Sequence, residues 1–272
     1  MAKTPTQNTT PMDRPKVVCL GGVHMDVRLR AKHHLVDGAS NPVSTLQRQG
    51  GVAYNVAQAL RVAGLTPRLL TLPPDSARAY IALEDAEGDL VYGLACLDSY
   101  ENLNGDFIRQ HETTIKDADW VLVDGNCQKD AFAAWPDGTS KVALISVSPA
   151  KMNHFLPILP KADWLFCNRE EWQILQSLYE GSFNRLHILE TRGSEGCLLH
   201  EPSCDSSGHI HHNFAANEDA ATVQATADQT GLGDCLAGLV MQHVICGFDP
   251  ISSVQEALDH LPETLRAVRS AK

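Results

Sequence analysis

The residues most suited to chemistry lie late in the chain, at positions 228–234, where the sequence reads Asp-Gln-Thr-Gly-Leu-Gly-Asp. Apolar residues then recur at helical spacing from Leu236 to Val244, which predicts that Asp234 stands in the first turn of a helix. Unpaired backbone N–H groups and the helix dipole favour an anion at such a position. A carboxylate beside them could take a proton from a hydroxyl that attacks a bound phosphate. Taken alone, Asp234 is better explained as a helix-capping residue, which is a common role for aspartate.

A pair of glycines begins another predicted helix earlier in the chain. Gly50 and Gly51 permit a ligand to approach the backbone closely, and Asn55, one turn later, has an amide that can hydrogen-bond a hydroxyl. Asp26 follows a buried strand predicted at 16–20, and ligands of parallel sheets lie beyond such strand ends. Each position also has an ordinary explanation, as a glycine turn or as a loop carboxylate.

Two polar segments follow predicted strands in the second half of the chain. Asn168 and Glu171 come after the strand at 164–167, where an amide and a carboxylate could contact a metal–phosphate complex. The turn after the strand at 186–190 suits nucleotide phosphates. Its polar and glycine positions are Thr191, Gly193 and Gly196. Helix caps and β-turns use the same residue types, so neither segment is specific alone.

These segments need a parallel sheet to bring them together. Strands expected at 119–124, 142–147, 164–167 and 186–190 alternate with helical patterns. Repeated βα units predict a mostly parallel sheet covered by helices on both faces, an α/β fold. Residues 77–97 have the pattern of a hairpin, and residues 27–49 that of an extended ribbon. Near the end, an apolar segment at 254–261 is followed by Pro262 and a charged tail.

Composition narrows the function classes. With 272 residues, 43% of them apolar and 20% charged, the chain is long and apolar enough for one sizeable α/β domain or two small ones. A net charge of −11 argues against binding of nucleic acid. No apolar run approaches the about 20 residues of a membrane span. Residues 1–15 are polar and rich in Thr and Pro, which predicts a disordered leader.

Eight cysteines are scattered without a Cys-x-x-Cys pair, which favours a reduced, cytoplasmic protein with buried free thiols. His209, His211 and His212 lie near Cys197 and Cys204, a combination that raises zinc as an alternative. The spacing fits no standard zinc site, and a polar loop or an edge strand explains it better.

Together and in order, these segments resemble the ribokinase-like (PfkB) family of sugar and nucleoside kinases. Residues 50–57 look like its N-terminal signature, and residues 228–234 look like its C-terminal signature, usually Asp-Thr-Thr-Gly-Ala-Gly-Asp. Residues 168–171 match its Asn-x-x-Glu motif, and residues 191–193 match its nucleotide-contacting turn. The resemblance runs from about residue 16 to about residue 248. It implies one doubly wound kinase domain over 16–272, with a small β lid formed by 24–49 and 77–97.

The resemblance implies ATP-dependent phosphorylation of a hydroxymethyl group, with ATP as co-substrate and Mg²⁺ bridging the phosphates. Asp234 would be the base, and the anion hole would be formed at Gly231, Leu232 and Gly233. The residues implied to hold the substrate are Asp26, Asn41, Gly50, Gly51 and Asn55. Those implied at the nucleotide are Asn168, Glu171, Thr191, Gly193, Gly196 and Thr230, with Glu171 also ordering the metal. A need for K⁺ stays open.

Within the family, Ser40-Asn41-Pro42 and the stretch 97–103 are most similar to the pseudouridine kinases, which form pseudouridine 5′-phosphate. Pseudouridine is therefore the leading substrate, ahead of ribose, adenosine or a fructose phosphate. The expected partners are this small molecule and ATP, with neither nucleic acid nor membrane. Open lid strands also make a homodimer through the lid an expectation.

Three departures from the family pattern support a second hypothesis. Leu232 replaces a small residue in the anion hole, a crossover helix is missing after Leu72, and the chain ends early, which predicts weak enclosure of adenine. The alternative is a catalytically weak relative that binds a nucleoside, a sugar or a protein partner. A dinucleotide-binding Rossmann enzyme fits poorly, because Gly21-Gly22-Val23-His24 is not Gly-x-Gly-x-x-Gly.

Overall fold

The computed structural model describes residues 15–75, 77–138, 140–203, 208–216 and 231–270. The strands of the larger sheet are β1 (Val17–Leu20), β4 (Arg68–Leu70), β7 (Trp120–Asp124), β8 (Lys141–Ile145), β9 (Trp164–Asn168), β10 (His187–Thr191), β11 (Cys197–Pro202) and β12 (His209–Phe214). Their order is β12-β11-β10-β9-β8-β7-β1-β4, and only β11 and β12 run antiparallel to their neighbours. The mostly parallel sheet predicted from the βα pattern is therefore confirmed. The histidine-rich segment forms β12, the edge strand.

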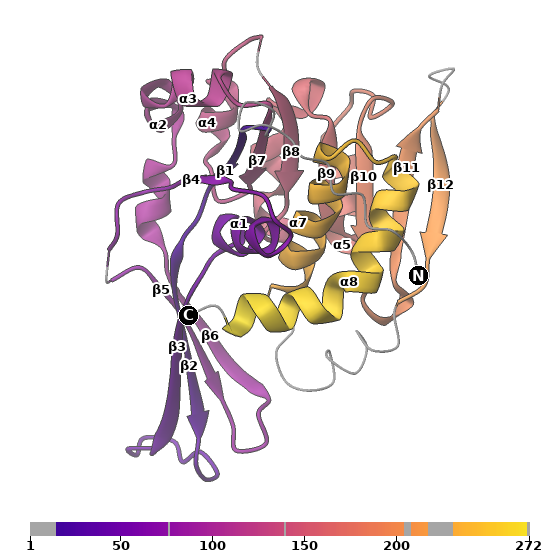
Figure 1. The fold of residues 1–272 in the computed structure, drawn as a ribbon. Helices are drawn as coiled ribbons and strands as arrows, with labels where there is room; N and C mark the ends of the chain where they lie inside the picture. The colour runs from indigo at the N-terminus through magenta and orange to yellow at the C-terminus, as the bar shows by residue number, and fades with distance from the viewer. Residues whose placement is uncertain (1–14, 76, 139, 204–207, 217–230, 271–272) are drawn as a thin grey trace.

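Two layers of helices cover this sheet (Figure 1). One layer contains α1 (Val52–Val62), α7 (Leu232–Ile245) and α8 (Pro250–Ser270). The other contains α2 (Gly105–Gln110), α3 (Glu112–Lys116), α4 (Lys129–Ala133) and α5 (Arg169–Leu178). Short 3₁₀ turns lie at η1 (Asp98–Asn102), η2 (Pro149–Phe155), η3 (Leu159–Lys161) and η4 (Gly193–Glu195). In the described part of the chain, no helix combines the length and apolar character needed to cross a membrane.

The alternation of side chains along the strands explains the two layers. In β1, Val17 and Cys19 pack into the apolar cluster under α1, α7 and α8, whereas Val18 and Leu20 pack into the cluster on the opposite face. Successive strand residues point to opposite faces, so a strand that is apolar throughout needs a cover on both sides. The described cysteines form no disulfide; Cys19, Cys127 and Cys167 are buried free thiols, as predicted.

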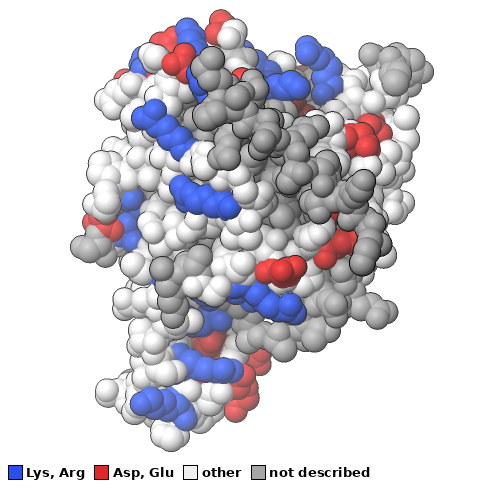
Figure 2. Space-filling model, viewed as in Figure 1, with Lys and Arg blue, Asp and Glu red and all other residues white. Residues whose placement is uncertain are grey.

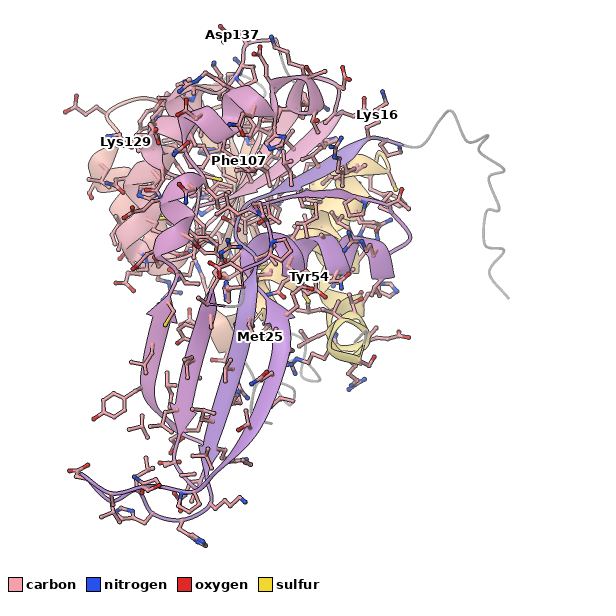
Figure 3. All side chains as sticks on the ribbon, turned by 90° about the vertical axis from the view of Figure 1, so that its left-hand side faces the viewer. Lys16, Met25, Tyr54, Phe107, Lys129 and Asp137 are labelled. Carbon is pink, nitrogen blue, oxygen red and sulfur yellow. The ribbon has the colours of Figure 1, made fainter. Side chains whose placement is uncertain are left out.

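A second, smaller sheet projects from this body (Figures 1 and 3). Its strands are β2 (His24–Ala31), β3 (Val43–Gly50), β5 (Ala79–Glu84) and β6 (Leu90–Cys96), in the order β3-β2-β5-β6. We call it the small sheet. Its strands occupy the parts of the chain for which a ribbon and a hairpin are predicted. The assignment of a single kinase domain with an inserted lid stays a prediction.

The last helix differs from the expectation of a charged tail after Pro262. α8 continues through Pro262 to Ser270 and changes direction along its course, so that its end approaches the root of the small sheet (Figure 1). A proline inside a helix removes one hydrogen bond and bends it without necessarily ending it. Leu261 and Leu265 are buried on either side of the proline, and this burial keeps the segment packed.

Candidate active site

The first and last signatures meet at the start of α7. Gly231 has a left-handed backbone (φ 83°) and precedes α7, and Asp234 stands in the first turn of that helix. The Asn55 amide, on α1, donates to Asp234 Oδ2 at 2.9 Å. A Cβ atom on Gly231 would lie 3.2 Å from Asn55 Nδ2. Glycine therefore permits both the left-handed turn and the close approach of the Asn55 side chain. Residues far apart in sequence thus form one polar centre beside unpaired helix-start amides.

The carboxyl group of Asp234 is a better proton acceptor than an exposed one. Burial raises its pKa from 3.8 to about 7, although the Asn55 hydrogen bond acts against the rise. The carboxylates of Asp124, Asp26 and Glu171 raise this pKa further, because nearby negative charges disfavour the ionised form of Asp234. A base with a pKa near neutrality is well matched to proton transfer at physiological pH.

Asp26 lies at the start of the small sheet, in a polar chain that links the sheet to the body. Asp26 Oδ1 is 3.0 Å from His24 Nε2, and His24 Nδ1 is 2.7 Å from the Tyr100 hydroxyl. In neutral His24, Nε2–H donates to the carboxylate, so Nδ1 accepts from the Tyr100 O–H. Burial raises the pKa of Tyr100 well above its usual value, so the hydroxyl keeps its proton and can donate a hydrogen bond.

The glycine pair before α1 is required by two close approaches. A Cβ atom on Gly50 would lie 2.0 Å from Asp26 Oδ2. A Cβ atom on Gly51, whose φ is 101°, would lie 2.3 Å from the carbonyl oxygen of Gly22. The structure therefore places Gly50 directly against Asp26, and Gly51 against the turn that follows β1.

Asp124, at the end of β7, is a site residue that the sequence analysis missed. It is 1% exposed, and its carboxylate accepts from the amides of Gly22 (2.9 Å), Ala53 (3.0 Å) and Asn126 (2.8 Å). Burial raises the pKa of Asp124, and these amide donors limit the rise. Asp124 thus joins the turn after β1 to the start of α1. A carboxylate ending a buried strand could have marked it in sequence.

The Asn168 and Glu171 pair caps α5. Asn168 Oδ1 accepts from the Glu171 amide at 2.9 Å, and Glu171 Oε2 accepts from the Asn168 amide at 2.8 Å and from Ser146 Oγ at 2.6 Å. This capping box holds a buried carboxylate at the carboxyl edge of the sheet.

The described residues hold no group of three or more His, Cys, Asp or Glu side chains placed to share a metal ion. Mg²⁺ needs no such group, because it commonly binds through one or two carboxylates together with substrate phosphates and water. Both hydrogen bonds that Glu171 accepts from described residues go to Oε2. Oε1 can therefore face a hydrated ion, so the donor set fits Mg²⁺ held mainly by phosphates.

The predicted nucleotide turn joins β10 to β11. Thr191 ends β10, and the Arg192 amide donates to the Gly196 carbonyl at 2.8 Å. Gly193 and Gly196 have positive φ values of 58° and 94°, which this tight turn requires. The turn lies at the same edge of the sheet as Asn168, because β9 and β10 are parallel neighbours with Thr191 opposite Asn168. Thr230 lies outside the described residues.

Asn41 is not brought to this centre. It lies in the loop between β2 and β3, and its side chain bonds the backbone of Val36 and Ala39. In the pairing of these strands, His24 lies opposite Gly50 at one end and Ala31 opposite Val43 at the other. Seven residue steps of about 3.3 Å separate the two ends. Asn41 therefore stabilises the distal loop, and the structure lends no support to a role at the substrate.

A cavity of about 340 Å³ lies between the small sheet and helices α1, α7 and α8. Asp26, Asn55 and Gly231 line it, together with Tyr54 and Tyr80. Figure 3 shows Tyr54 on α1 close to the root of the small sheet. The volume is in the range of small-molecule sites, about 300–1,000 Å³. Two of the predicted substrate residues, Asp26 and Asn55, therefore line a space that a small molecule can enter.

Several solved structures that share this fold are sugar or nucleoside kinases. A carbohydrate kinase from Agrobacterium tumefaciens superposes with a TM-score of 0.72 at 20% identity, over 93% of this chain and 96% of that one. A ribokinase from Cryptococcus neoformans in complex with ADP gives 0.64 at 17% identity, over 95% and 100%. A Burkholderia thailandensis nucleoside kinase in complex with inosine gives 0.64 at 15% identity, over 90% and 90%. The predicted ribokinase-like fold is confirmed.

In sequence, the chain is similar to a pseudouridine-metabolizing bifunctional protein of Schizosaccharomyces pombe. The two are 26% identical over 204 residues, which cover 62% of this chain. The matched part spans 27% of the length of that relative. No family model matches the chain.

Proposed function

We propose that this protein is an ATP-dependent kinase that phosphorylates the 5′-hydroxyl of a nucleoside or sugar, with pseudouridine as the leading substrate. The observation that carries this proposal is the Asn55–Asp234 pair at the start of α7, at 2.9 Å. It combines a carboxyl group whose pKa is about 7 with helix-start amides that can hold a phosphoryl group.

Each residue of the centre has a role in this reaction. Asp234 takes the proton of the attacking hydroxyl, and the amides at Gly231, Leu232 and Gly233 hold the negative charge of the transferred group. Asp26 and Asn55 hold the sugar hydroxyls. Asn168, Glu171 and the turn at residues 191–196 face the nucleotide. Bound Mg²⁺ would neutralise phosphate charge, with Glu171 as its protein ligand.

The bulk of Leu232 suggested a crowded anion hole, but the position of its side chain argues against such crowding. Its side chain is partly buried and packs against the apolar cluster under α1, α7 and α8. A side chain held in that cluster leaves the amide edge of the helix start accessible to phosphate. This contact favours the enzyme over the catalytically weak relative.

The likeness to the Schizosaccharomyces pombe protein supports pseudouridine over other nucleosides, and free buried thiols support a cytoplasmic location. Basic and acidic side chains are interspersed on the described part of the face in Figure 2. That pattern fits small-molecule partners better than a nucleic acid, which needs clustered positive charge.

The test is phosphate transfer from ATP–Mg²⁺ to pseudouridine, uridine and ribose, in Na⁺ and in K⁺ buffers. Asp234→Asn should lower kcat by about 10²–10⁴-fold, the usual contribution of a general base. Asp106→Asn, which changes an exposed carboxylate, should leave kcat unchanged. Turnover of ribose alone would exclude pseudouridine as the substrate. Binding without turnover of any acceptor would establish the non-catalytic alternative.

A further inference from the structure

The cavity has one wall that the kinase proposal does not use. Leu265, Val268 and Arg269, from the part of α8 beyond Pro262, line it opposite the small sheet. Leu265 is 1% exposed, and Val268 is partly buried against the same apolar cluster. The last turns of the chain's final helix are therefore built into the cavity.

The facing wall is one side of the small sheet. Arg28 pairs with both Leu46 and Ala82, and Asp26 pairs with both Arg48 and Tyr80. Paired residues lie on the same face of a sheet, and residues two apart do as well. All six of these residues line the cavity. The side of the sheet that carries Asp26 therefore also carries Tyr80, Leu46 and Ala82.

The lining is mixed, and its apolar part at Leu46, Ala82 and Val268 suggests what occupies the space beyond the sugar. A free sugar presents hydroxyls on most of its surface and gains little from Leu, Val and Ala side chains. A planar heterocyclic base presents two apolar faces and a polar edge, and aliphatic and aromatic walls suit such a ring. Arg48, on the same face of the small sheet as Asp26, lines the cavity and can meet a polar edge.

We propose that the end of α8 recognises the aromatic base of a nucleoside, with Val268 packing against the ring. The inference rests on the proposed function for the position of the sugar, next to Asp26 and Asn55. It makes the segment after Pro262 the part that distinguishes a nucleoside from a free sugar. The change of direction along α8 brings this wall to the cavity (Figure 1).

The experiment measures equilibrium binding of pseudouridine, uridine and ribose to the full chain by titration calorimetry, without ATP. Val268→Trp should place an indole ring in the part of the cavity where the base would bind. It should weaken pseudouridine and uridine binding at least about tenfold, or about 1.4 kcal/mol, while ribose binding is unchanged. Val268→Ala should weaken nucleoside binding in the same selective way through lost contact. Arg266→Trp introduces the same indole ring at an exposed position of α8 and should change neither nucleoside nor ribose binding. Thermal unfolding of each variant checks that it is folded.

Equal loss of ribose and nucleoside binding in folded Val268→Trp, or no loss of either, would overturn the proposal. So would a wild-type protein that binds the two nucleosides no more tightly than ribose. Phosphate transfer is assayed separately on the same preparations. Selective loss of nucleoside binding without any phosphate transfer would uphold base recognition by α8 and reject the kinase.

Discussion

At the scale of single residues, the carboxyl group of Asp234 is more basic than an exposed one, and its ionised form lowers the stability of the folded protein. The protein around it favours the protonated form, since burial and three other carboxylates raise its pKa to about 7. The ionised base is therefore an unfavourable group in the folded state at neutral pH. Catalytic groups with such shifts commonly cost a protein part of its stability.

This cost predicts a pH-dependent gain from Asp234→Asn. The folded pKa is raised from 3.8 to about 7, so the contribution of Asp234 to stability is present below about pH 4 and is lost as the pH rises to about 7. The variant has no carboxyl to ionise and keeps an oxygen for Asn55. It should be more stable than the wild type by about 1–3 kcal/mol at pH 8, and by less at pH 5. Urea unfolding at both pH values measures this; a gain that does not grow with pH would contradict the assignment.

For Asp124→Asn we expect the opposite effect, a loss of stability. Its two oxygens accept three backbone amides, and the carboxamide of Asp124→Asn has one acceptor oxygen. At least one buried amide then loses its partner, so the free energy of unfolding should fall by about 1–3 kcal/mol. Asp106→Asn, at an exposed ion pair, should change it by less than about 0.5 kcal/mol. Equal effects in urea unfolding would show that the Asp124 bonds contribute little.

At the scale of elements, Arg78 joins the root of the small sheet to the body. It is 5% exposed, and its guanidinium donates to Ser99 Oγ (2.8 Å), the Val23 carbonyl (3.3 Å) and the Pro73 carbonyl (3.2 Å). It also lies 5.7 Å from the centre of the Tyr100 ring. These partners flank β2, β4 and β6, so one side chain couples the strand roots to the Tyr100–His24–Asp26 chain.

Arg78→Met should loosen this root. The change leaves the buried Val23 carbonyl without this donor and removes a buried guanidinium, so stability should fall by about 1–3 kcal/mol. It should also raise KM for the acceptor more than it lowers kcat, because Asp26 loses its orientation while Asp234 does not. Steady-state kinetics and urea unfolding measure the two effects. Arg109→Met, at a surface ion pair, is the control; an unchanged KM in Arg78→Met would show that the root does not position Asp26.

At the scale of the whole molecule, the small sheet has an uncovered apolar surface. Leu90, Tyr92 and Leu94 alternate along the edge strand β6 and are 61%, 61% and 53% exposed. An open edge with exposed apolar side chains is suited to pairing with another chain.

We expect sedimentation equilibrium at about 1–100 µM to show a dimer, the usual closed homo-oligomer. Leu94→Lys should produce monomers, because a charge cannot be buried unpaired in an apolar contact. Leu178→Lys, at an exposed leucine on α5, should leave the dimer intact. A wild-type monomer over this range, or a dimer unaffected by Leu94→Lys, would exclude association through the small sheet.

Local chemistry was enough to predict much of this protein from its sequence. Apolar runs such as residues 16–20 and 119–124 predicted the buried parallel strands, because such strands must be apolar on both faces. Glycines before an apolar helical pattern predicted the starts of α1 and α7, since few other residues adopt positive φ there. Asp26, Gly51, Asn55 and Asp234 stood out because of their places near strand and helix ends, whereas their assignment to one substrate site came from the resemblance and stays a prediction.

The tertiary structure alone decided the features that depend on contacts between distant segments. Asp124 reads as the last residue of a strand, and its three amide partners come from elsewhere in the chain or from the following turn. Asn41 stands in a recognisable motif, yet strand pairing carries it to the far loop of the small sheet. Pro262 suggested the end of a helix, but burial of Leu261 and Leu265 outweighs one missing hydrogen bond. A local pattern cannot report such packing, and packing made α8 a wall of the cavity.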